Sequence, residues 1–273
     1  MSEPFVLAPA ALEAVLDAIR GAGAAIQRVK AEGFDVQSKG EAGPVTRADR
    51  EADALLREAL PRIIPAAWLS EETKDDPARL AQRRLWVVDP LDGTKEFVEG
   101  VPHYAVAAGL VEDGEPVLGV VHNPSGGETL WAVRGGGTFR DGKRVLAAEG
   151  RGLGASRSEI RRGEFAPFEG EWEVRALGSI AWKLALVAGG SLAATVSRGP
   201  KHEWDVCAGA MLVLEAGGCI TDCYGEPLRF NRPFPKTRGV LAGAPAAFAR
   251  LRAAVDAVGV SDRMGEFGGG PAG

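Results

Sequence analysis

A short apolar run, residues 85–88, ends abruptly in the segment Asp89-Pro90-Leu91-Asp92-Gly93-Thr94. Such a run is typical of a buried strand, the proline fixes the backbone φ angle, and the glycine permits a tight reversal. The carboxylates of Asp89 and Asp92 can therefore converge on one point. Converging anions repel each other unless a cation lies between them, so this turn predicts a Mg²⁺ site. The alternative is that Asp89 and Asp92 are ordinary turn and N-cap residues.

The chain around this turn alternates between helix and strand signals. Apolar residues at spacings of three and four predict a helix over residues 12–29, and Thr46 is expected to cap a second helix that ends at Pro61. Strands over residues 104–111, 117–122 and 129–133, separated by turn residues, indicate an antiparallel meander.

Beyond about residue 150, helices and strands alternate. Helices are expected from Gly178-Ser179 to about Val187, from Trp204-Asp205 to Ala216, and from Pro245 to Val258. We therefore expect an N-terminal α+β half (residues 1–150) and a C-terminal α/β half (residues 151–260), stacked in layers. The Gly-rich tail, residues 261–273, is expected to be disordered.

Composition excludes several classes of protein. The 273 residues carry a net charge of −5, which argues against a binder of nucleic-acid polymers, since such a protein needs a basic face. Three scattered cysteines do not make a disulfide framework and indicate a reducing compartment. We find no signal peptide and no membrane span, so a cytoplasmic location is expected. A small phosphorylated substrate remains compatible with the acidic balance, provided that bound cations neutralise the site.

Three further segments place acids where a metal site could use them. Glu71 follows an apolar patch, Asp49 lies three residues after Thr46 at the start of the second helix, and Asp205 begins an otherwise apolar helix. Each has an ordinary alternative: a solvated loop for Glu71, a capping box for Asp49, and a helix N-cap for Asp205.

The order of these pieces along the chain is more specific than any one of them. It resembles the lithium-sensitive, magnesium-dependent phosphatase superfamily, which includes the inositol monophosphatases, the fructose-1,6-bisphosphatases and the bisphosphate nucleotidases. The resemblance covers roughly residues 10 to 258 and implies the layered αβαβα sandwich of that family. It also implies that two or three Mg²⁺ ions are held by Glu71, Asp89, Asp92 and Asp205 and by the backbone carbonyl of Leu91.

The same resemblance implies the remaining roles. Asp49 with Thr94 would orient or deprotonate the attacking water, and Gly93 with Thr94 would hold the phosphate. The rest of the substrate would be contacted by Gly178, Ser179 and Lys183. Inhibition by Li⁺ and either a monomer or a homodimer are further expectations that the family suggests.

Two features indicate the substrate. Lys95-Glu96-Phe97 looks like the bacterial 3′(2′),5′-bisphosphate nucleotidase branch, known as CysQ, and the stretch Ser197–His202 is basic where inositol phosphatases usually carry a Glu. Arg198 and Lys201 suit a second phosphate, although they could equally be solvated surface charges. We expect removal of the 3′-phosphate of adenosine 3′,5′-bisphosphate to give AMP, a step that belongs to sulfur metabolism. The alternatives are an inositol or sugar phosphate as substrate, and a non-catalytic phosphometabolite-binding protein.

Overall fold

Strand β4 (Arg84–Asp92) is buried on both of its faces. In the computed structural model, which describes residues 5–38 and 44–259, Leu85 and Val87 belong to one core cluster, and Trp86 and Val88 belong to another. Successive side chains of a strand point to opposite faces of a sheet. The sheet that contains β4 is therefore covered by a separate layer on each side.

This larger sheet is mixed. Within residues 5–38 and 44–259 it has seven strands in the order β3-β4-β5-β6-β7-β8-β9, of which β3 and β4 are parallel and the other neighbours are antiparallel. The strands besides β4 are β3 (Ala67–Ser70), β5 (Ala105–Glu112), β6 (Glu115–Asn123), β7 (Glu128–Val133), β8 (Gly137–Arg140) and β9 (Lys143–Val145). The expected antiparallel meander is confirmed as β5, β6 and β7.

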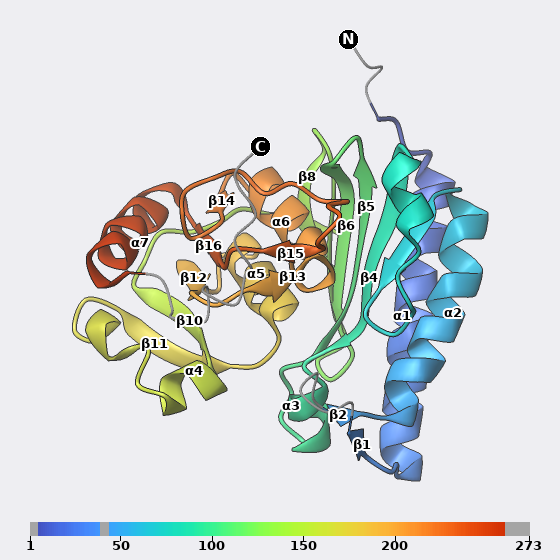
Figure 1. Ribbon diagram of the computed structural model, residues 1–273, viewed down its shortest axis with the longest axis horizontal. Helices are drawn as coiled ribbons and strands as arrows, with labels where there is room; N and C mark the ends of the chain where they lie inside the picture. The colour runs from blue at the N-terminus through green and yellow to red at the C-terminus, as the bar shows by residue number, and fades with distance from the viewer. Residues whose placement is uncertain (1–4, 39–43, 260–273) are drawn as a thin grey trace.

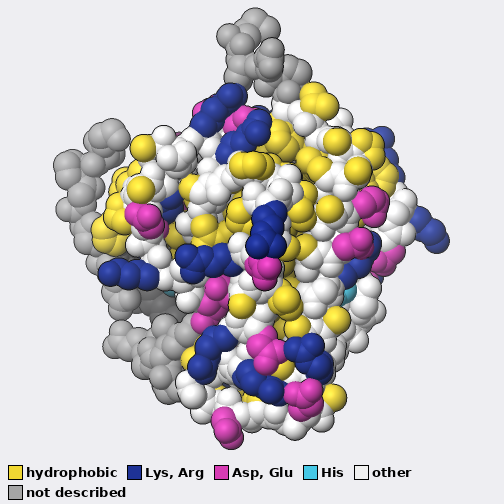
Figure 2. All heavy atoms as spheres, turned by 90° about the vertical axis from the view of Figure 1, so that its right-hand side faces the viewer, with side chains coloured by type: hydrophobic (Ala, Val, Ile, Leu, Met, Phe, Trp, Pro, Cys, Tyr) yellow, Lys and Arg dark blue, Asp and Glu magenta, His cyan; other side chains and the backbone are white. Residues whose placement is uncertain are grey.

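Two helix pairs cover this sheet. Helices α1 (Pro9–Glu32) and α2 (Arg47–Ile63) pack on the outer face, and α5 (Ile180–Ala188) and α6 (Glu203–Glu215) pack on the inner face (Figure 1). Figure 2, which looks onto the outer face, shows acidic and basic side chains interspersed there.

The smaller sheet lies beyond α5 and α6. Its described order is β11-β10-β12-β16-β14, with α4 (Arg157–Arg161) and α7 (Pro245–Val258) on its far side (Figure 1). Its strands are β10 (Gly152–Ser156), β11 (Glu173–Leu177), β12 (Ala194–Ser197), β14 (Cys219–Thr221) and β16 (Val240–Gly243). Leu241 packs toward α7, whereas Val240 and Ala242 pack toward α6, so this sheet too is buried on both faces.

Short elements complete the fold. They are β1 (Gln37–Ser38), β2 (Pro44–Val45), α3 (Thr94–Val98), β13 (Lys201–His202), β15 (Lys236–Thr237) and two 3₁₀ turns, η2 (Pro77–Ala81) and η3 (Ala166–Phe168). The segments β1 with β2 and β13 with β15 form two-stranded ribbons. Among the described residues, no helix is both long and apolar enough to cross a bilayer.

The αβαβα sandwich expected from the resemblance is confirmed, and one helix boundary is wrong. Helix α2 continues through Pro61 to Ile63. Proline removes one N–H bond and crowds the carbonyl one turn back, and the helix ends two residues after Pro61. The two sheets use residues 67–145 and 152–243, while the division of the chain into two halves near residue 150 stays a prediction. The tail, residues 261–273, lies outside the described residues.

A glycine allows α6 to approach the larger sheet. A Cβ atom on Gly119 would lie 2.4 Å from the backbone oxygen of Ala208 and 2.8 Å from the Cβ of Met211. We expect Gly119→Ala to lower the free energy of unfolding by about 1–3 kcal/mol, because the helix must shift away from the sheet. Chemical denaturation measures this loss.

The matched control is Gly21→Ala in α1, where a Cβ meets nothing within 4 Å. This change should leave stability unaltered or raise it by about 0.5–1 kcal/mol, because alanine favours a helix more than glycine does. Equal unfolding free energies for the two variants would contradict the close approach of α6.

Candidate active site

A bulge at the end of β4 turns Asp89 and Asp92 to the same side. Asp89 pairs with Ala107 and Asp92 pairs with Ala105, so the two residues of β4 between the aspartates face one residue of β5. Residues directly opposite each other in a sheet share a face, and Ala105 and Ala107 both pack toward α5 and α6. In a regular strand, side chains three residues apart would point to opposite faces.

Glu71 is brought to the same end of the sheet by the parallel pairing of β3 with β4. Its backbone N–H donates to the carbonyl of Val88 at 3.3 Å, directly before Asp89. Carboxyl ends of parallel strands lie at one edge of a sheet. The loop that carries Glu71 therefore lies at the same end of the sheet as Asp89.

Asp92 is tied to the N-terminus of α5. Its Oδ2 accepts hydrogen bonds from the Ser179 hydroxyl at 2.6 Å and from the Ala181 N–H at 2.7 Å. The Ser179 Oγ also accepts from the Trp182 N–H at 2.9 Å, and the Ser179 backbone has a φ of 52°, which is uncommon for a residue with a side chain. These bonds join the end of β4 to the start of α5 at the site.

Asp205 approaches from the first turn of α6. Its Oδ2 accepts the backbone N–H of His202, the N-cap residue, at 3.1 Å, so Asp205 caps the helix from its third position and is not itself the expected N-cap. The same carboxylate also acts electrostatically on Asp89 and Asp92. Capping and membership of the acidic cluster are therefore compatible.

The electrostatics show how closely these acids are grouped. Burial, and then the charges of Glu71, Asp92 and Asp205, raise the pKa of Asp89 well above its usual value. Burial and the Asp205 charge raise the pKa of Asp92 to about 6, against the hydrogen bond from Ser179. Burial raises the pKa of Asp205 to about 6 as well, with Lys201 opposing the rise. A cation among these acids would relieve the repulsion.

The donor set fits a hard divalent cation. Asp89, Asp92 and Asp205 each use one oxygen for a local N–H or O–H donor, and the other oxygen has no hydrogen-bond partner in the part of the chain that the structure describes. Carboxylate oxygens are the ligands that Mg²⁺ prefers. The same described part contains no preformed group of three or more acids, histidines or cysteines at metal-binding spacing.

Asp49 lies beside the cluster within the expected capping box. Its Oδ2 accepts the backbone N–H and the hydroxyl of Thr46, both at 2.7 Å, and its Oδ1 lies 2.8 Å from the hydroxyl of Thr94. The Thr94 hydroxyl is also 3.1 Å from the carbonyl oxygen of Leu91. Since a hydroxyl donates only one proton, the Asp49 bond leaves the Leu91 oxygen available to another ligand.

Gly93 and Gly178 occupy places that exclude a larger residue. Gly93 has a φ of +94°, and a Cβ there would lie 2.9 Å from the carbonyl oxygen of His103. A Cβ on Gly178 would lie 2.3 Å from the Cγ of Glu96. Both glycines thus let α3, α5 and their loops meet at the site.

Lys183 and Lys201, two of the three expected basic residues, lie near the acids. Lys183 is buried, its ammonium lies 2.7 Å from the Ser156 hydroxyl, and burial lowers its pKa to about 8 while Glu159, Asp92 and Glu96 oppose that shift. Lys201 acts on Asp205. These two lysines therefore lie on the side of the site that the C-terminal half provides.

Arg198 is placed differently. Its guanidinium donates to the carbonyls of Glu164 at 2.9 Å and Gly259 at 3.1 Å, and it lies 6.0 Å from the ring centroid of Phe168. These contacts occupy Arg198 inside the C-terminal half, and nothing in the structure brings it to the acids.

Sequence reasoning missed Lys236, which acts on Asp205, and Glu159, which is buried near Lys183 and Lys201. No local motif marks them. Lys236 is placed opposite His202 by the pairing of β15 with β13. Glu159 belongs to the short helix α4.

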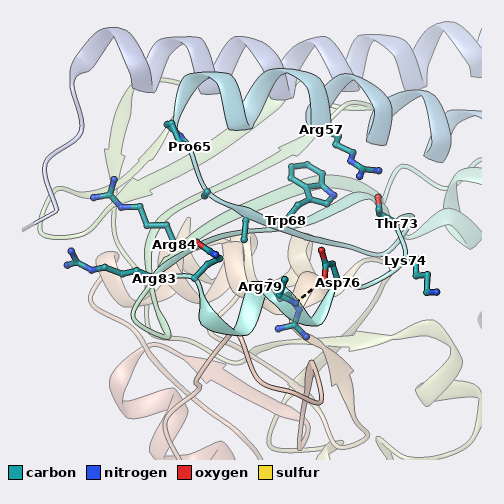
Figure 3. Close-up of a pocket in the computed structure, with 13 residues that line it drawn as sticks. Arg57, Pro65, Trp68, Thr73, Lys74, Asp76, Arg79, Arg83 and Arg84 are labelled. Atoms are coloured by element: carbon teal, nitrogen blue, oxygen red, sulfur yellow. Dashed lines mark hydrogen bonds between the residues drawn. The ribbon is translucent and has the colours of Figure 1, made fainter.

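A cavity of about 790 Å³ lies away from the acids, beside β3 and η2 (Figure 3). Its lining includes Trp68, Arg79 and Arg84, but none of the four acids described above. Arg79 pairs with Asp75 at 2.6 Å and Arg84 pairs with Glu112 at 3.1 Å. Its charges are thus largely compensated, and it holds no group for phosphoryl transfer.

The raised pKa values predict how stability depends on pH. Without divalent cations, we expect these acids to make the free energy of unfolding decrease as the pH rises from about 4 to 6. The unfolded chain releases its protons near 3.8, whereas folded Asp92 and Asp205 retain theirs to about 6. Asp92→Asn should make this decrease in the free energy of unfolding smaller. Urea denaturation in EDTA at several pH values between about 3.5 and 7, which span the titration of the unfolded and the folded chain, measures it.

Asp113→Asn, on an exposed turn, is the control and should keep the pH dependence of the wild type. If the wild type and Asp92→Asn respond identically to pH, Asp92 is not part of a repelling cluster.

Comparison with characterised proteins gives relatives of two kinds. The chain is 34% identical over 232 residues to an inositol-1-monophosphatase of Rhizobium meliloti, covering 79% of this chain and 86% of the relative. It is 32% identical over 235 residues to the 3′(2′),5′-bisphosphate nucleotidase CysQ of Aggregatibacter actinomycetemcomitans, covering 81% and 87%. Among solved structures, the extragenic suppressor protein suhB of Bartonella henselae superposes with a TM-score of 0.79 at 29% identity, covering 90% of this chain and 98% of that one.

The family model described as the inositol monophosphatase family matches residues 10–259. This range contains both sheets, the acidic cluster and the capping box. The chain therefore belongs to the inositol monophosphatase family and is a phosphatase of that family.

Proposed function

We propose that this protein is a Mg²⁺-dependent phosphatase that removes the 3′-phosphate of adenosine 3′,5′-bisphosphate. The observation that carries the proposal is the opposition of two charge groups across one site. The acids Glu71, Asp89, Asp92 and Asp205 gather at the end of β4, and Lys183 and Lys201 face them from the C-terminal half. The acids suit metal-assisted phosphoryl transfer, and the lysines supply positive charge that suits a substrate with two phosphates.

In this proposal, Asp49 and Thr94 act on the attacking water. The Asp49 carboxylate is held by two bonds from Thr46 and accepts the Thr94 hydroxyl. The Thr94 oxygen then has lone pairs that accept a hydrogen bond from water, and proton transfer toward Asp49 makes that water more nucleophilic. Both side chains are buried or half-buried, so their orientation is set before substrate arrives.

Glu71, Asp89, Asp92, Asp205 and the Leu91 carbonyl would hold the metal ions. When bound, Mg²⁺ supplies Lewis acidity and positive charge that stabilise the transferring phosphoryl group. The chain itself contributes Gly93 and Thr94, whose amides at the start of α3 would bind phosphate oxygens. Gly178, Ser179 and Lys183 would position the rest of the substrate.

The reaction needs no covalent enzyme intermediate. The water oxygen bonds to phosphorus as the bond from phosphorus to the 3′ oxygen breaks, one water proton passes toward Asp49, and the 3′ oxygen takes up a proton from solvent. The products are AMP and inorganic phosphate, so atoms and charge balance. Positioning and charge neutralisation supply most of the catalysis in such transfers.

Inositol 1-phosphate is the second candidate substrate, because inositol-1-monophosphatases are among the relatives at 34% identity. The basic segment around Lys201 favours the bisphosphate instead, because a ring of hydroxyl groups gives a lysine no second anion to bind. A purely binding role has less support, since each expected acid is present at the site.

Phosphate release with Mg²⁺ tests the choice of substrate. We expect adenosine 3′,5′-bisphosphate to be hydrolysed with a kcat/KM at least about tenfold above that of inositol 1-phosphate, since one charged contact is worth about that factor. Asp92→Asn should lose activity toward both, which excludes a contaminating phosphatase. Preference for inositol 1-phosphate would overturn the substrate and leave the metal chemistry in place.

Lithium tests the metal site separately. At limiting Mg²⁺, we expect added LiCl to lower the rate more than the same concentration of KCl, because Li⁺ would compete for the carboxylates that hold Mg²⁺. Raising the Mg²⁺ concentration should reverse part of the loss. Equal effects of the two salts would show that ionic strength alone is responsible.

A further inference from the structure

The ribbon of β13 and β15 gathers a cation and two aromatic rings beside Asp205. In this antiparallel pair His202 is directly opposite Lys236, and Lys201 is opposite Thr237. Opposite residues share a face, so His202 and Lys236 lie on one face of the ribbon. The His202 ring stacks on that of Trp204, with centroids 4.4 Å apart and planes 9° from parallel. Both rings remain partly exposed.

The Lys236 ammonium is available to a ligand. Among residues 5–38 and 44–259, no carboxylate forms an ion pair with Lys236, and its side chain is half-buried rather than extended into solvent. It is close enough to Asp205 to act on that acid electrostatically. A free cation is therefore held next to the proposed catalytic acids.

Glu203 anchors this cation to α6. The fully buried Glu203 carboxylate accepts the backbone N–H groups of Asn231 at 2.8 Å and Arg232 at 3.0 Å, and the Glu203 N–H donates to the carbonyl of Pro235 at 2.9 Å. The segment that leads to Lys236 is thus bonded at both ends to the first residue of the helix that carries Asp205. Such anchoring limits the entropy that a ligand would have to remove.

We propose that Lys236 and the His202–Trp204 stack form a subsite for a nucleoside monophosphate group: Lys236 binds the phosphate that is not transferred, and the outer face of the stack binds the base. This inference rests on the proposed function and names the residues that would select a nucleotide. An ammonium is a strong partner for phosphate oxygens, and a flat aromatic pair stacks with any base. Inositol offers neither a second phosphate nor an aromatic face.

Binding of AMP, the expected product, tests the subsite without turnover. Calorimetry with Mg²⁺ compares AMP and adenosine on the full chain. Lys236→Gln should weaken AMP about tenfold and leave adenosine unchanged, because only the phosphate contact is lost. His202→Ala keeps the backbone donor to Asp205 and should weaken both ligands about fivefold, because the base loses its stacking surface. Lys143→Gln, an exposed lysine on β9, is the control and should match wild type.

Kinetics provide the second readout. Lys236→Gln should raise the KM for adenosine 3′,5′-bisphosphate about tenfold and raise the KM for inositol 1-phosphate much less, because only the nucleotide carries a second phosphate. AMP binding equal to wild type in Lys236→Gln, or equal KM changes for both substrates, would overturn the subsite while the phosphatase proposal stands. If the wild-type protein releases no phosphate from the nucleotide, the proposed function is wrong. If the wild-type protein also fails to bind AMP, the proposed subsite is wrong too.

Discussion

Repulsion among buried carboxylates at the end of β4 is the interaction around which the site is organised. Asp89 is buried and lies near the charges of Glu71, Asp92 and Asp205, all of which raise its pKa. A folded chain accepts such a grouping only where a counter-charge or strong hydrogen bonds offset it. The surrounding structure supplies the hydrogen bonds: Ser179 and Ala181 on Asp92, His202 on Asp205, and Leu91 on Asp89. The remaining charge is what a divalent cation would neutralise.

The layered fold explains why acids so far apart in the chain meet. The larger sheet supplies Asp89 and Asp92 from one strand, and the parallel strand beside it leads directly to Glu71. Helices α5 and α6 lie between the two sheets, and their N-termini carry Ser179 and Asp205. Because Cys207 of α6 lies directly against Gly109 and Ala208 lies directly against Gly119, this helix lies close to the larger sheet. The site is therefore a product of core packing rather than of a loop alone.

Features encoded by neighbouring residues were predictable from the sequence. The end of β4, the Thr46–Asp49 capping box and the starts of α5 and α6 follow from local patterns of apolar, capping and turn residues. The extra residue that turns Asp89 and Asp92 to one face was not predictable, because it depends on the register between β4 and β5. Arg198 shows the same limit: its position in a basic stretch suggested a substrate contact, yet its guanidinium bonds to carbonyls at Glu164 and Gly259. Long-range pairing, which local sequence does not encode, decides where such a side chain lies.

The proposed metal ligands and the proposed nucleotide contacts lie on different parts of this molecule. Asp89, Asp92 and Asp205 sit on the core elements β4 and α6, whereas Lys201, His202 and Lys236 sit on a two-stranded ribbon that leads into α6. Under the proposed function, a change in the ribbon would alter which phosphorylated molecule binds and would leave these three acids where the core places them. Relatives named for inositol phosphates and for bisphosphate nucleotides resemble this chain about equally, at 34% and 32% identity. Such similar identities do not separate the two substrate classes, and the proposed choice of the nucleotide therefore rests on the ribbon side chains near Asp205.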